Sequence, residues 1–552
     1  METKEQYKDC ILFYRLGDFY EMFFDDALVA SKELEITLTG KSCGLEERAP
    51  MCGIPYHAVE GYLSKLVSRG YKVAICEQVE DPKLAKGLVK REVIRVVTPG
   101  TNLNVQSLEA GKNNYLLSIA YTSDGIGISA ADVTTGDYYV TEVEDLKKLN
   151  DELMKYEPSE IICNEAFLVS GFDVNDLKSR LHISVNALES HMFDDDGCRR
   201  ILMKHFRVNT LIGLGVEEFP TGLLAAGALL QYLYDTQKTD LEHFTHIYPY
   251  LTSKYMLLDS STRRNLELTE TLREKQKRGS LLWVLDKTKT AMGGRLLRNY
   301  IEQPLIDKEE MEKRLDAIQE LNQDSISRDE IREYLNPVYD LERLLSKVTY
   351  KTANPRDLIA FRNSLQMLPP IKTVLSGFQK EELAAIREEI DGLEDIYQLI
   401  DEAIVEEPPI SIREGGMIKD QFDETIDHLR AAKQWLVQLE EEDRERTGIK
   451  NLKIKKNNVF GYFFEVTNSY KDLVPEDYIR KQTLANAERY TTPRLKELED
   501  TILNAEDKLQ TLEYDIFCRI RDTIAQELVR IQNTAKALAK LDVYASLSLV
   551  SE

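Results

Sequence analysis

Two long stretches of regularly spaced apolar residues lie in the C-terminal half of the chain. In the second stretch the spacing alternates between three and four positions, which places one apolar stripe along a helix and is typical of a coiled-coil seam. The first stretch, from Ile418 to about Thr447, would form a helix of about 45 Å at about 1.5 Å per residue. Two helices of similar reach predict a pair of antiparallel levers. Their apolar residues are Ile418, Phe422, Ile426, Leu429, Ala432, Leu436 and Leu439, then Leu495, Leu498, Ile502, Ala505, Leu509, Leu512 and Ile516.

The levers would be one part of a protein with several domains. A chain of 552 residues exceeds what one hydrophobic core usually organises, and about 100 to 200 residues per domain gives roughly three to five domains. Up to about Gly100, short apolar runs alternate with helical stretches, which predicts a small mixed α/β domain over residues 1–103. The predicted strands are Ile11–Tyr14, Val73–Cys76 and Val93–Val97, and the predicted helices are Phe23–Leu34 and Ala58–Ser68.

A second α/β domain follows. Three segments, Tyr115–Tyr121, Gly125–Asp132 and Asp137–Thr141, are separated by turn sequences and predict an antiparallel meander. We assign them to a connector domain over residues 112–240.

The remainder of the chain is almost wholly helical. Many Leu, Glu, Lys and Arg residues and few glycines predict a helical core with its levers over residues 251–447 and 494–552. Between the levers, residues 448–493 have strand character around an Asn457-Asn458 turn. The sequence therefore predicts a small β module inserted at the tips of the two levers.

The charge of the chain is distributed unevenly. A net charge of −24 argues against a protein that coats nucleic acid indiscriminately, because phosphate neutralisation is the sequence-independent source of affinity. From Arg444 to Lys496, however, twelve Lys or Arg stand against six acids. This excess suits nucleic acid, and a solvated charged hairpin is the alternative interpretation of the same residues.

Two patterns could indicate catalysis, and neither meets the chemical requirement. Gly40-Lys41-Ser42 looks like the end of a phosphate-binding P-loop, but Glu35 stands where that loop needs a second glycine. Asp132 and Asp137 could hold metal ions for a nuclease, but two-ion cleavage needs several converging carboxylates. Turn or surface aspartates explain both residues more simply. We therefore expect no ATPase site, no catalytic residue and no metal ligand in this chain.

The N-terminus and the cysteines bear on location. Residues 1–8 are polar and carry no secretory signal, and no apolar run approaches the roughly 20 residues of a membrane helix. Seven scattered cysteines without a C-x-x-C pair indicate reduced, mostly buried thiols. We expect a cytoplasmic protein with no membrane partner.

The segment Arg15-Leu-Gly-Asp-Phe-Tyr-Glu-Met-Phe23 has two interpretations. From the residues alone, Asp18 is a helix N-cap, Phe19 an apolar residue near the helix start and Glu21 a first-turn acid. The other interpretation depends on what accompanies the segment elsewhere in the chain.

Long, ordered motifs accompany it through nearly the whole chain. With the Arg15–Phe23 segment, they resemble the bacterial MutS family of DNA mismatch-repair proteins. The motifs are Met51-Cys-Gly-Ile-Pro-Tyr-His-Ala-Val-Glu-Gly-Tyr62, Ala74-Ile-Cys-Glu-Gln78, Val97-Thr-Pro-Gly-Thr101, Ser261-Thr-Arg-Arg-Asn-Leu-Glu267, Met292-Gly-Gly-Arg-Leu-Leu297, Gly461-Tyr-Phe463 and Arg480-Lys-Gln-Thr-Leu-Ala-Asn-Ala-Glu-Arg-Tyr490.

The resemblance implies that Phe19 and Glu21 read mispaired bases. Phe19 would wedge into the minor groove and stack on the faulty base, while Glu21 would hydrogen-bond it. Unstacking costs a few kcal/mol per step and least where pairing is already faulty, and kinking the site costs of order 1 to 6 kcal/mol. A carboxylate beside phosphates should also disfavour intact duplex.

The resemblance also implies contacts to the DNA backbone. Lys41 and Arg91 belong to the domain that would read the base, and Lys455, Arg480 and Lys481 belong to the β module. Such contacts position a protein without reading sequence. A solvated surface explains any one of these residues equally well.

The implied architecture is multidomain α/β plus all-α: a mismatch-recognition domain, an RNase H-like connector, a long-helix core with levers and an inserted β clamp. The family adds an ATPase domain that uses ATP and magnesium, and this chain ends about where that domain would start, so we expect a fragment. The implied partners are mismatched duplex DNA, a second copy in a homodimer weakened by truncation, and downstream repair proteins. A metal-dependent RNase H-like nuclease and a recombination-junction binder are the alternatives.

Overall fold

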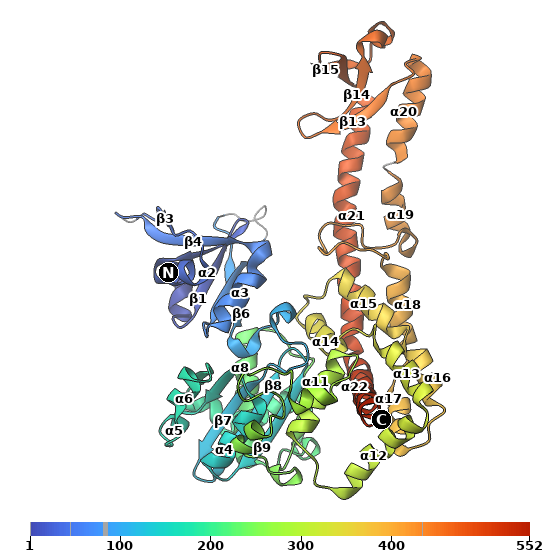
Figure 1. The fold of residues 1–552 in the computed structure, drawn as a ribbon. Coiled ribbons are helices and arrows are strands. Elements are labelled where there is room, and N and C mark those ends of the chain that lie inside the picture. Colours follow the sequence, from blue (N-terminus) through green and yellow to red (C-terminus); the bar gives the residue numbers. More distant parts are fainter. Residues whose placement is uncertain (1, 45, 81–86, 433) are drawn as a thin grey trace. The chain divides into compact units, whose positions relative to one another are not determined.

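The computed structural model describes residues 2–44, 46–80, 87–432 and 434–552, which form two compact units (Figure 1). The first unit contains two mixed α/β parts followed by helices, and the second contains long helices and a small sheet. Mixed α/β and helical content is the class that the sequence predicts. The first unit comprises Met1–Thr352, Met367–Gly392 and Glu527–Glu552, and the second comprises Ala353–Gln366 and Leu393–Gln526.

The N-terminal part is a six-stranded sheet in the order β3-β4-β2-β1-β5-β6. Two helices, α2 and α3, cover one face, and Phe13, Met22 and Ile54 are fully buried beneath them. The predicted strands and helices are confirmed within a few residues, but the local pattern missed β2, β3 and β4. The elements are α1 (Glu2–Gln6), β1 (Ile11–Leu16), β2 (Phe19–Phe23), α2 (Phe24–Leu34), β3 (Thr39–Lys41), β4 (Ala49–Pro55), α3 (Val59–Ser68), β5 (Val73–Gln78) and β6 (Arg91–Val97).

Strand β2 corrects one interpretation of the sequence. Phe19 pairs with Leu16 of β1 and with Pro55 of β4, so this segment lies inside the sheet. Phe19 and Glu21 are therefore strand residues, and the helix start with Asp18 as its N-cap is wrong. Helix α2 begins only at Phe24.

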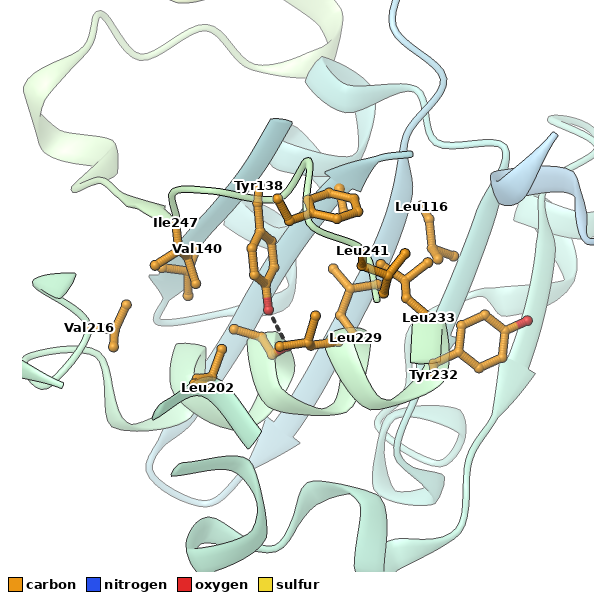
Figure 2. Close-up of a cluster of buried hydrophobic side chains, with 14 of the residues drawn as sticks. Leu116, Tyr138, Val140, Leu202, Val216, Leu229, Tyr232, Leu233, Leu241 and Ile247 are labelled. Carbon is orange, nitrogen blue, oxygen red and sulfur yellow. Dashed lines mark hydrogen bonds between the residues drawn. The ribbon is translucent and has the colours of Figure 1, made fainter. Parts of the chain in front are cut away.

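The second α/β part contains a six-stranded sheet in the order β11-β10-β7-β8-β9-β12. Strands β7, β8 and β9 pair antiparallel and confirm the predicted meander. The long apolar helix α8 packs on this sheet, and the Tyr138 hydroxyl donates to the Ala226 carbonyl within that core (Figure 2). The elements are β7 (Leu116–Thr122), β8 (Gly125–Asp132), β9 (Asp137–Val143), α4 (Leu146–Tyr156), β10 (Glu160–Cys163), α5 (Glu165–Leu168), α6 (Val174–Ser179), β11 (Ser184–Ala187), α7 (Asp195–Phe206), α8 (Pro220–Gln237) and β12 (Tyr248–Pro249).

Several helices of the first unit, α10 to α14 and α17, pack against α22. A Cβ at Gly293 would lie 2.3 Å from Asp542 Oδ2, so only glycine lets α11 approach α22 this closely. Asp542 accepts hydrogen bonds from the backbone of Lys289 and Thr290. The Met292-Gly-Gly motif is thus a packing motif. The helices are α9 (Ser260–Asn265), α10 (Leu281–Leu285), α11 (Ala291–Glu302), α12 (Lys308–Gln323), α13 (Ser325–Leu335), α14 (Leu341–Thr349), α16 (Leu368–Leu375), α17 (Glu381–Glu389) and α22 (Leu528–Val550).

The second unit contains the levers, which run side by side (Figure 1). Arg430 pairs with Glu513 at 2.6 Å and Glu442 pairs with Arg494 at 2.7 Å, so the second lever descends as the first ascends. This register confirms the antiparallel pair. The helices are α15 (Pro355–Leu365), α18 (Glu394–Ala403), α19 (Glu424–Ala431), α20 (Gln434–Thr447) and α21 (Pro493–Gln526).

The first lever differs from the single helix that was predicted from Ile418. The α-helix begins only at Glu424, after a short 3-10 helix at Asp420–Phe422, and the described part of the lever consists of α19 and α20. Upstream, the Glu513 carboxylate accepts hydrogen bonds from the amides of Gly416 (2.8 Å) and Ile418 (3.0 Å), which ties them to α21. The Ile418 side chain is fully buried although it lies outside the helix.

The β module is a four-stranded sheet in the order β13-β14-β16-β15. The predicted hairpin around Asn457 is confirmed, whereas the second hairpin had no clear local signal. Phe464, Tyr478 and Tyr490 form its core with residues at the lever ends. Its strands are β13 (Lys453–Asn457), β14 (Gly461–Thr467), β15 (Ile479–Thr483) and β16 (Ala487–Thr491). Within the described part of the chain, no helix is both long and apolar enough to cross a membrane.

Candidate nucleic-acid interface

The alternation of strand β2 presents three side chains on the face of the first sheet opposite α2 and α3. Tyr20 and Met22 point into the core, while Phe19, Glu21 and Phe23 alternate with them on the outer face. Phe19 is 47% exposed, an unusual state for a large aromatic side chain in a sheet. We call this outer surface of β2 and its neighbours the reader face.

The turn that carries Phe19 is held from several directions. The Arg15 guanidinium stacks on the Tyr56 ring at 3.8 Å and pairs with Glu77 at 3.1 Å. The Tyr56 amide donates to the Asp18 carbonyl at 2.9 Å, and Gly17 supplies the positive φ of 58° that the tight turn requires. The Tyr20 hydroxyl also donates to Glu77. Phe19 is therefore an exposed ring on an anchored support.

Glu21 is paired across the sheet. Its Oε2 accepts a hydrogen bond from Lys41 Nζ at 2.6 Å, and the same ammonium lies 5.7 Å from the centroid of the Phe23 ring. Gly53 stands opposite Glu21 on β4, and its missing side chain leaves space over the carboxylate stem. Gly40 and Lys41 lie on strand β3 instead of in a loop that leads into a helix, so they do not form a phosphate-binding loop.

Arg91 lies on the same face, farther along the sheet. Its Nε donates to the Arg15 carbonyl at 2.7 Å, its Nη1 donates to the Val89 carbonyl at 2.9 Å, and its guanidinium lies over the Tyr14 ring at 5.4 Å. Tyr14 is the β1 partner of Glu21. The sheet therefore places the four site residues predicted in the N-terminal domain on one face. They are Phe19, Glu21, Lys41 and Arg91, and the Arg91 side chain is held by the carbonyls of Arg15 and Val89.

The β module presents a different kind of surface. Strand pairing places Lys453, Lys455, Phe463, Glu465 and Arg489 on one face. Lys455 pairs with Glu465 at 2.6 Å, and Arg489 lies 3.8 Å from the second oxygen of that carboxylate and 4.5 Å from the Phe463 ring centroid. We call this surface, made of these five described residues, the clamp face. The Glu465 carboxylate is shared between Lys455 and Arg489.

Arg480 and Lys481 are not on the clamp face with Lys455. Arg480 stands opposite Tyr490 and reaches Glu488 at 3.6 Å, and Lys481 is the extra residue of a register shift on the edge strand β15. Such a bulge redirects a side chain. Lys481 is exposed and, among the described residues, has no acidic partner. Of the three predicted backbone contacts, Lys455 is paired with Glu465, Arg480 is loosely paired with Glu488, and Lys481 has no acidic partner among the described residues.

Glu488 anchors this side of the module. It is buried, accepts a hydrogen bond from the Tyr490 hydroxyl and pairs with Lys471 at 3.0 Å. The Tyr490 hydroxyl, followed by Lys471 and Arg480, holds the pKa of Glu488 below its ordinary value of 4.5. Its position and contacts indicate a structural residue, not one that is available for chemistry.

The nuclease interpretation of the meander does not fit the geometry. Asp132 accepts hydrogen bonds from Asn113, Asn114 and Thr134, and Asp137 accepts from Asn113 and Thr135. Both carboxylates are thus used within the fold, and burial raises the pKa of Asp137. Within the described ranges, no group of three or more His, Cys, Asp or Glu could hold a metal ion.

Residue-by-residue reasoning missed the support of the reader face. Arg15, Tyr56 and Glu77 each lie inside one of the ordered motifs, so the signal was present, but their mutual contacts join strands β1 and β5 and the turn after β4. The Glu21–Lys41 pair was also missed, because Lys41 alone looks like any exposed lysine.

Comparison with known families identifies the architecture. Residues 1–106 match the model of MutS domain I, residues 114–245 match MutS domain II, and residues 261–548 match MutS domain III. The three matches, in chain order, define a multidomain protein assembled from MutS domains I to III. The chain belongs to the MutS family.

Curated relatives agree with this assignment. The chain is similar to a protein of Lachnoclostridium phytofermentans named DNA mismatch repair protein MutS, 66% identical over 556 residues, which cover 100% of this chain and 60% of the relative. Proteins of the same name from Ruminiclostridium cellulolyticum and Acetivibrio thermocellus are 54% and 52% identical, each with 100% of this chain and 64% of the relative covered. The chain therefore spans less than two thirds of the length of these relatives.

Proposed function

We propose that this chain binds duplex DNA and recognises mispaired or unpaired bases with its reader face. The observation that carries the proposal is Phe19, a large aromatic ring that is 47% exposed on an anchored turn, two positions from the paired carboxylate of Glu21. The names of the relatives agree with a role in mismatch repair.

The chemistry of a wedge favours faulty base pairs. An apolar side chain that enters between base steps must unstack them, at a cost of a few kcal/mol per step. A mispaired step has already lost part of that stacking and pairing, so the cost is lower there. The turn under Phe19 is fixed by Arg15 and Tyr56, so the protein loses little conformational entropy when the ring is inserted.

Glu21 supplies the polar half of the recognition. Its carboxylate accepts hydrogen bonds only, and an N–H on the edge of a displaced base would be a suitable donor. Lys41 and Arg91 lie on the same face, where they could contact phosphates on either side of the wedge.

The β module would contribute affinity for duplex DNA without reading its base sequence. Lys453 and Lys481 are exposed cations with no acid paired to them among the described residues, and they are suited to phosphate contacts. We further propose that binding of this kind initiates DNA mismatch repair, with a second copy of the chain and downstream repair proteins as partners. We also propose that residues 112–240 form an RNase H-like connector and that the β module acts as a clamp at the lever tips.

Equilibrium binding tests the function directly. The chain would be titrated with a duplex that carries one G·T pair, with the same duplex carrying one unpaired T, and with the matched duplex, all at one salt concentration. We expect tighter binding to both faulty duplexes. Equal affinity for all three would contradict the proposal. Cleavage of any duplex in the presence of Mg²⁺ would instead favour a nuclease.

A further inference from the structure

The ion pair between Glu21 and Lys41 is a feature of the reader face whose effect on recognition the function above leaves open. It joins residues twenty positions apart through the pairing of β2 with β4 and of β4 with β3. The Glu21 side chain is 15% exposed and that of Lys41 is 40% exposed, at an N–O distance of 2.6 Å. The pair therefore lies at the surface, with its acid more sheltered than its base.

The described residues engage only one oxygen of the Glu21 carboxylate. Lys41 Nζ contacts Oε2, while Oε1 accepts no hydrogen bond from another described residue. Gly53 lies opposite Glu21 and has no side chain. A Cβ at Gly53 would already lie 3.6 Å from Glu21 Cγ, so a larger residue there would cover the carboxylate. Lys41 thus orients the carboxylate and leaves its second oxygen available.

The same contact changes the electrostatics of the reader face. A lone carboxylate near two strands of phosphates would repel every duplex, faulty or intact. Paired with Lys41, it contributes little net charge but keeps its acceptor geometry. Arg91, another cation on this face, is occupied by the carbonyls of Arg15 and Val89, and among the described residues no contact joins it to Glu21.

We propose that Lys41 is a specificity-determining positioning residue: it masks the charge of Glu21 and aims the free oxygen, and is more than a phosphate contact. The aiming of the carboxylate rests on the proposed mismatch-reading function, whereas the masking of its charge acts on any duplex. The two interpretations of Lys41 differ in one measurable respect. A phosphate contact acts independently of Glu21, and a masking residue acts through it.

A double-mutant cycle on the whole chain separates these interpretations. Affinities for the matched and the G·T duplex would be measured at one salt concentration for wild type, Lys41→Ala, Glu21→Gln and the double variant. On matched duplex we expect Lys41→Ala to weaken binding about three- to fivefold more in the wild-type background than in the Glu21→Gln background, the range of a partly exposed ion pair. On the G·T duplex, Lys41→Ala should lower the preference for the faulty pair by a similar factor.

Two further variants control for charge and for geometry. Lys41→Arg retains a cation that can pair with Glu21, so it should restore most of the preference. Lys32→Ala removes an exposed charge from α2, on the far side of the sheet, and should show no coupling to Glu21→Gln. A general loss of positive charge would affect both lysine variants alike.

The outcomes separate failure of this inference from failure of the proposed function. If Lys41→Ala costs the same factor on matched duplex in the wild-type and in the Glu21→Gln background, Lys41 is a phosphate contact and the inference is overturned. If the wild-type chain does not prefer the G·T duplex, mismatch reading fails, while the cycle on matched duplex still decides whether Lys41 masks Glu21. Coupling on matched duplex supports the masking in either case.

Discussion

The reader face and the clamp face differ in how their charged side chains are paired. On the reader face, Glu21 and Lys41 form an ion pair at 2.6 Å, next to the exposed Phe19 ring. On the clamp face, two cations share the carboxylate of Glu465, and Lys453 is left without an acid among the described residues. On the reader face the charges of Glu21 and Lys41 nearly cancel and Arg91 is held by backbone carbonyls, whereas the β module has exposed cations without an acidic partner among the described residues.

This difference separates specificity from affinity. Phosphates are the same in every duplex, so surplus cations raise affinity for all DNA alike. A neutral, rigid surface with one aromatic wedge gains little from phosphates and depends on how easily the base stack opens. An acidic chain with a net charge of −24 can therefore bind DNA selectively if its free cations belong to a different module from its reading residues.

The largest expected effect is that of Phe19→Ala. Removal of the ring should lower the preference for a G·T or unpaired-T duplex about tenfold or more, the contribution of one base stacked on an aromatic side chain. Binding to matched duplex should change little. Phe24→Ala, which removes another exposed ring from the same domain, is the control and should retain the preference. A preference that survives Phe19→Ala would place the reading residue elsewhere.

A smaller effect, of another kind, is expected for Lys481→Ala. Loss of one phosphate contact should weaken matched and faulty duplexes equally and reduce the slope of log affinity against log salt by about 0.9. Lys508→Ala, an exposed lysine on α21, should leave the slope unchanged. Should the Lys481 variant change the ratio between the two duplexes, the separation of the two faces would be wrong.

Lys455→Ala should have a still smaller effect. Glu465 already holds this ammonium at 2.6 Å, so a phosphate must compete with an internal partner. We expect the salt slope to change by less than it does for Lys481→Ala. Glu465→Gln should have the opposite sign, because it frees both Lys455 and Arg489 and tightens binding to every duplex. Weaker binding by Glu465→Gln would instead show that Glu465 holds Lys455 and Arg489 in position for binding.

The smallest effect on binding at neutral pH is expected for Glu488, which acts on stability. Because its pKa is lowered in the folded state, Glu488 stabilises the module above pH 4.5, and this contribution is lost as pH falls through the folded pKa. Glu488→Gln should remove that part of the acid sensitivity. Urea unfolding at pH 7 and pH 4 would be followed by the fluorescence of Trp435 on α20, in a Trp283→Phe background. Equal acid sensitivity in both proteins would contradict the assignment.

Local patterns predicted the elements whose signals are local. The meander of β7 to β9 and the long helix α21 were predicted by alternation and by three-four spacing, which depend only on neighbouring residues. Strand β2 was missed because Phe19–Phe23 lies directly before a helix and is equally compatible with a helix start. Its strand character comes from β1 and β4 on either side. The helix start predicted at Ile418 was wrong for a similar reason. An apolar side chain can be buried beside a helix as well as within one, so its apolar character does not show that it belongs to the helix.

In the candidate site, too, the sequence predicted which residues take part, and the tertiary contacts decided the state of each one. Phe19 and Glu21 were found through the resemblance of long motifs, and no count of charges or apolar residues would have selected them. Lys41, Arg91, Lys455, Arg480 and Lys481 were named as similar backbone contacts. The structure gives each a different state: Lys41 is paired with Glu21, Arg91 is held by carbonyls, and Lys455 is held by Glu465. Arg480 is loosely paired with Glu488, and Lys481 lies on a bulge with no acidic partner among the described residues.

By itself the sequence determined the order of α/β and helical parts, the antiparallel levers, the excess of positive charge near their tips and the family of the protein. These properties follow from periodicity, composition and motif order along the chain. Only the tertiary structure decided which charges are neutralised and which rings are supported. An ion pair such as Glu21–Lys41 or a stack such as Arg15–Tyr56 requires strands from distant parts of the chain to come within a few ångströms, and that depends on the pairing of the whole sheet.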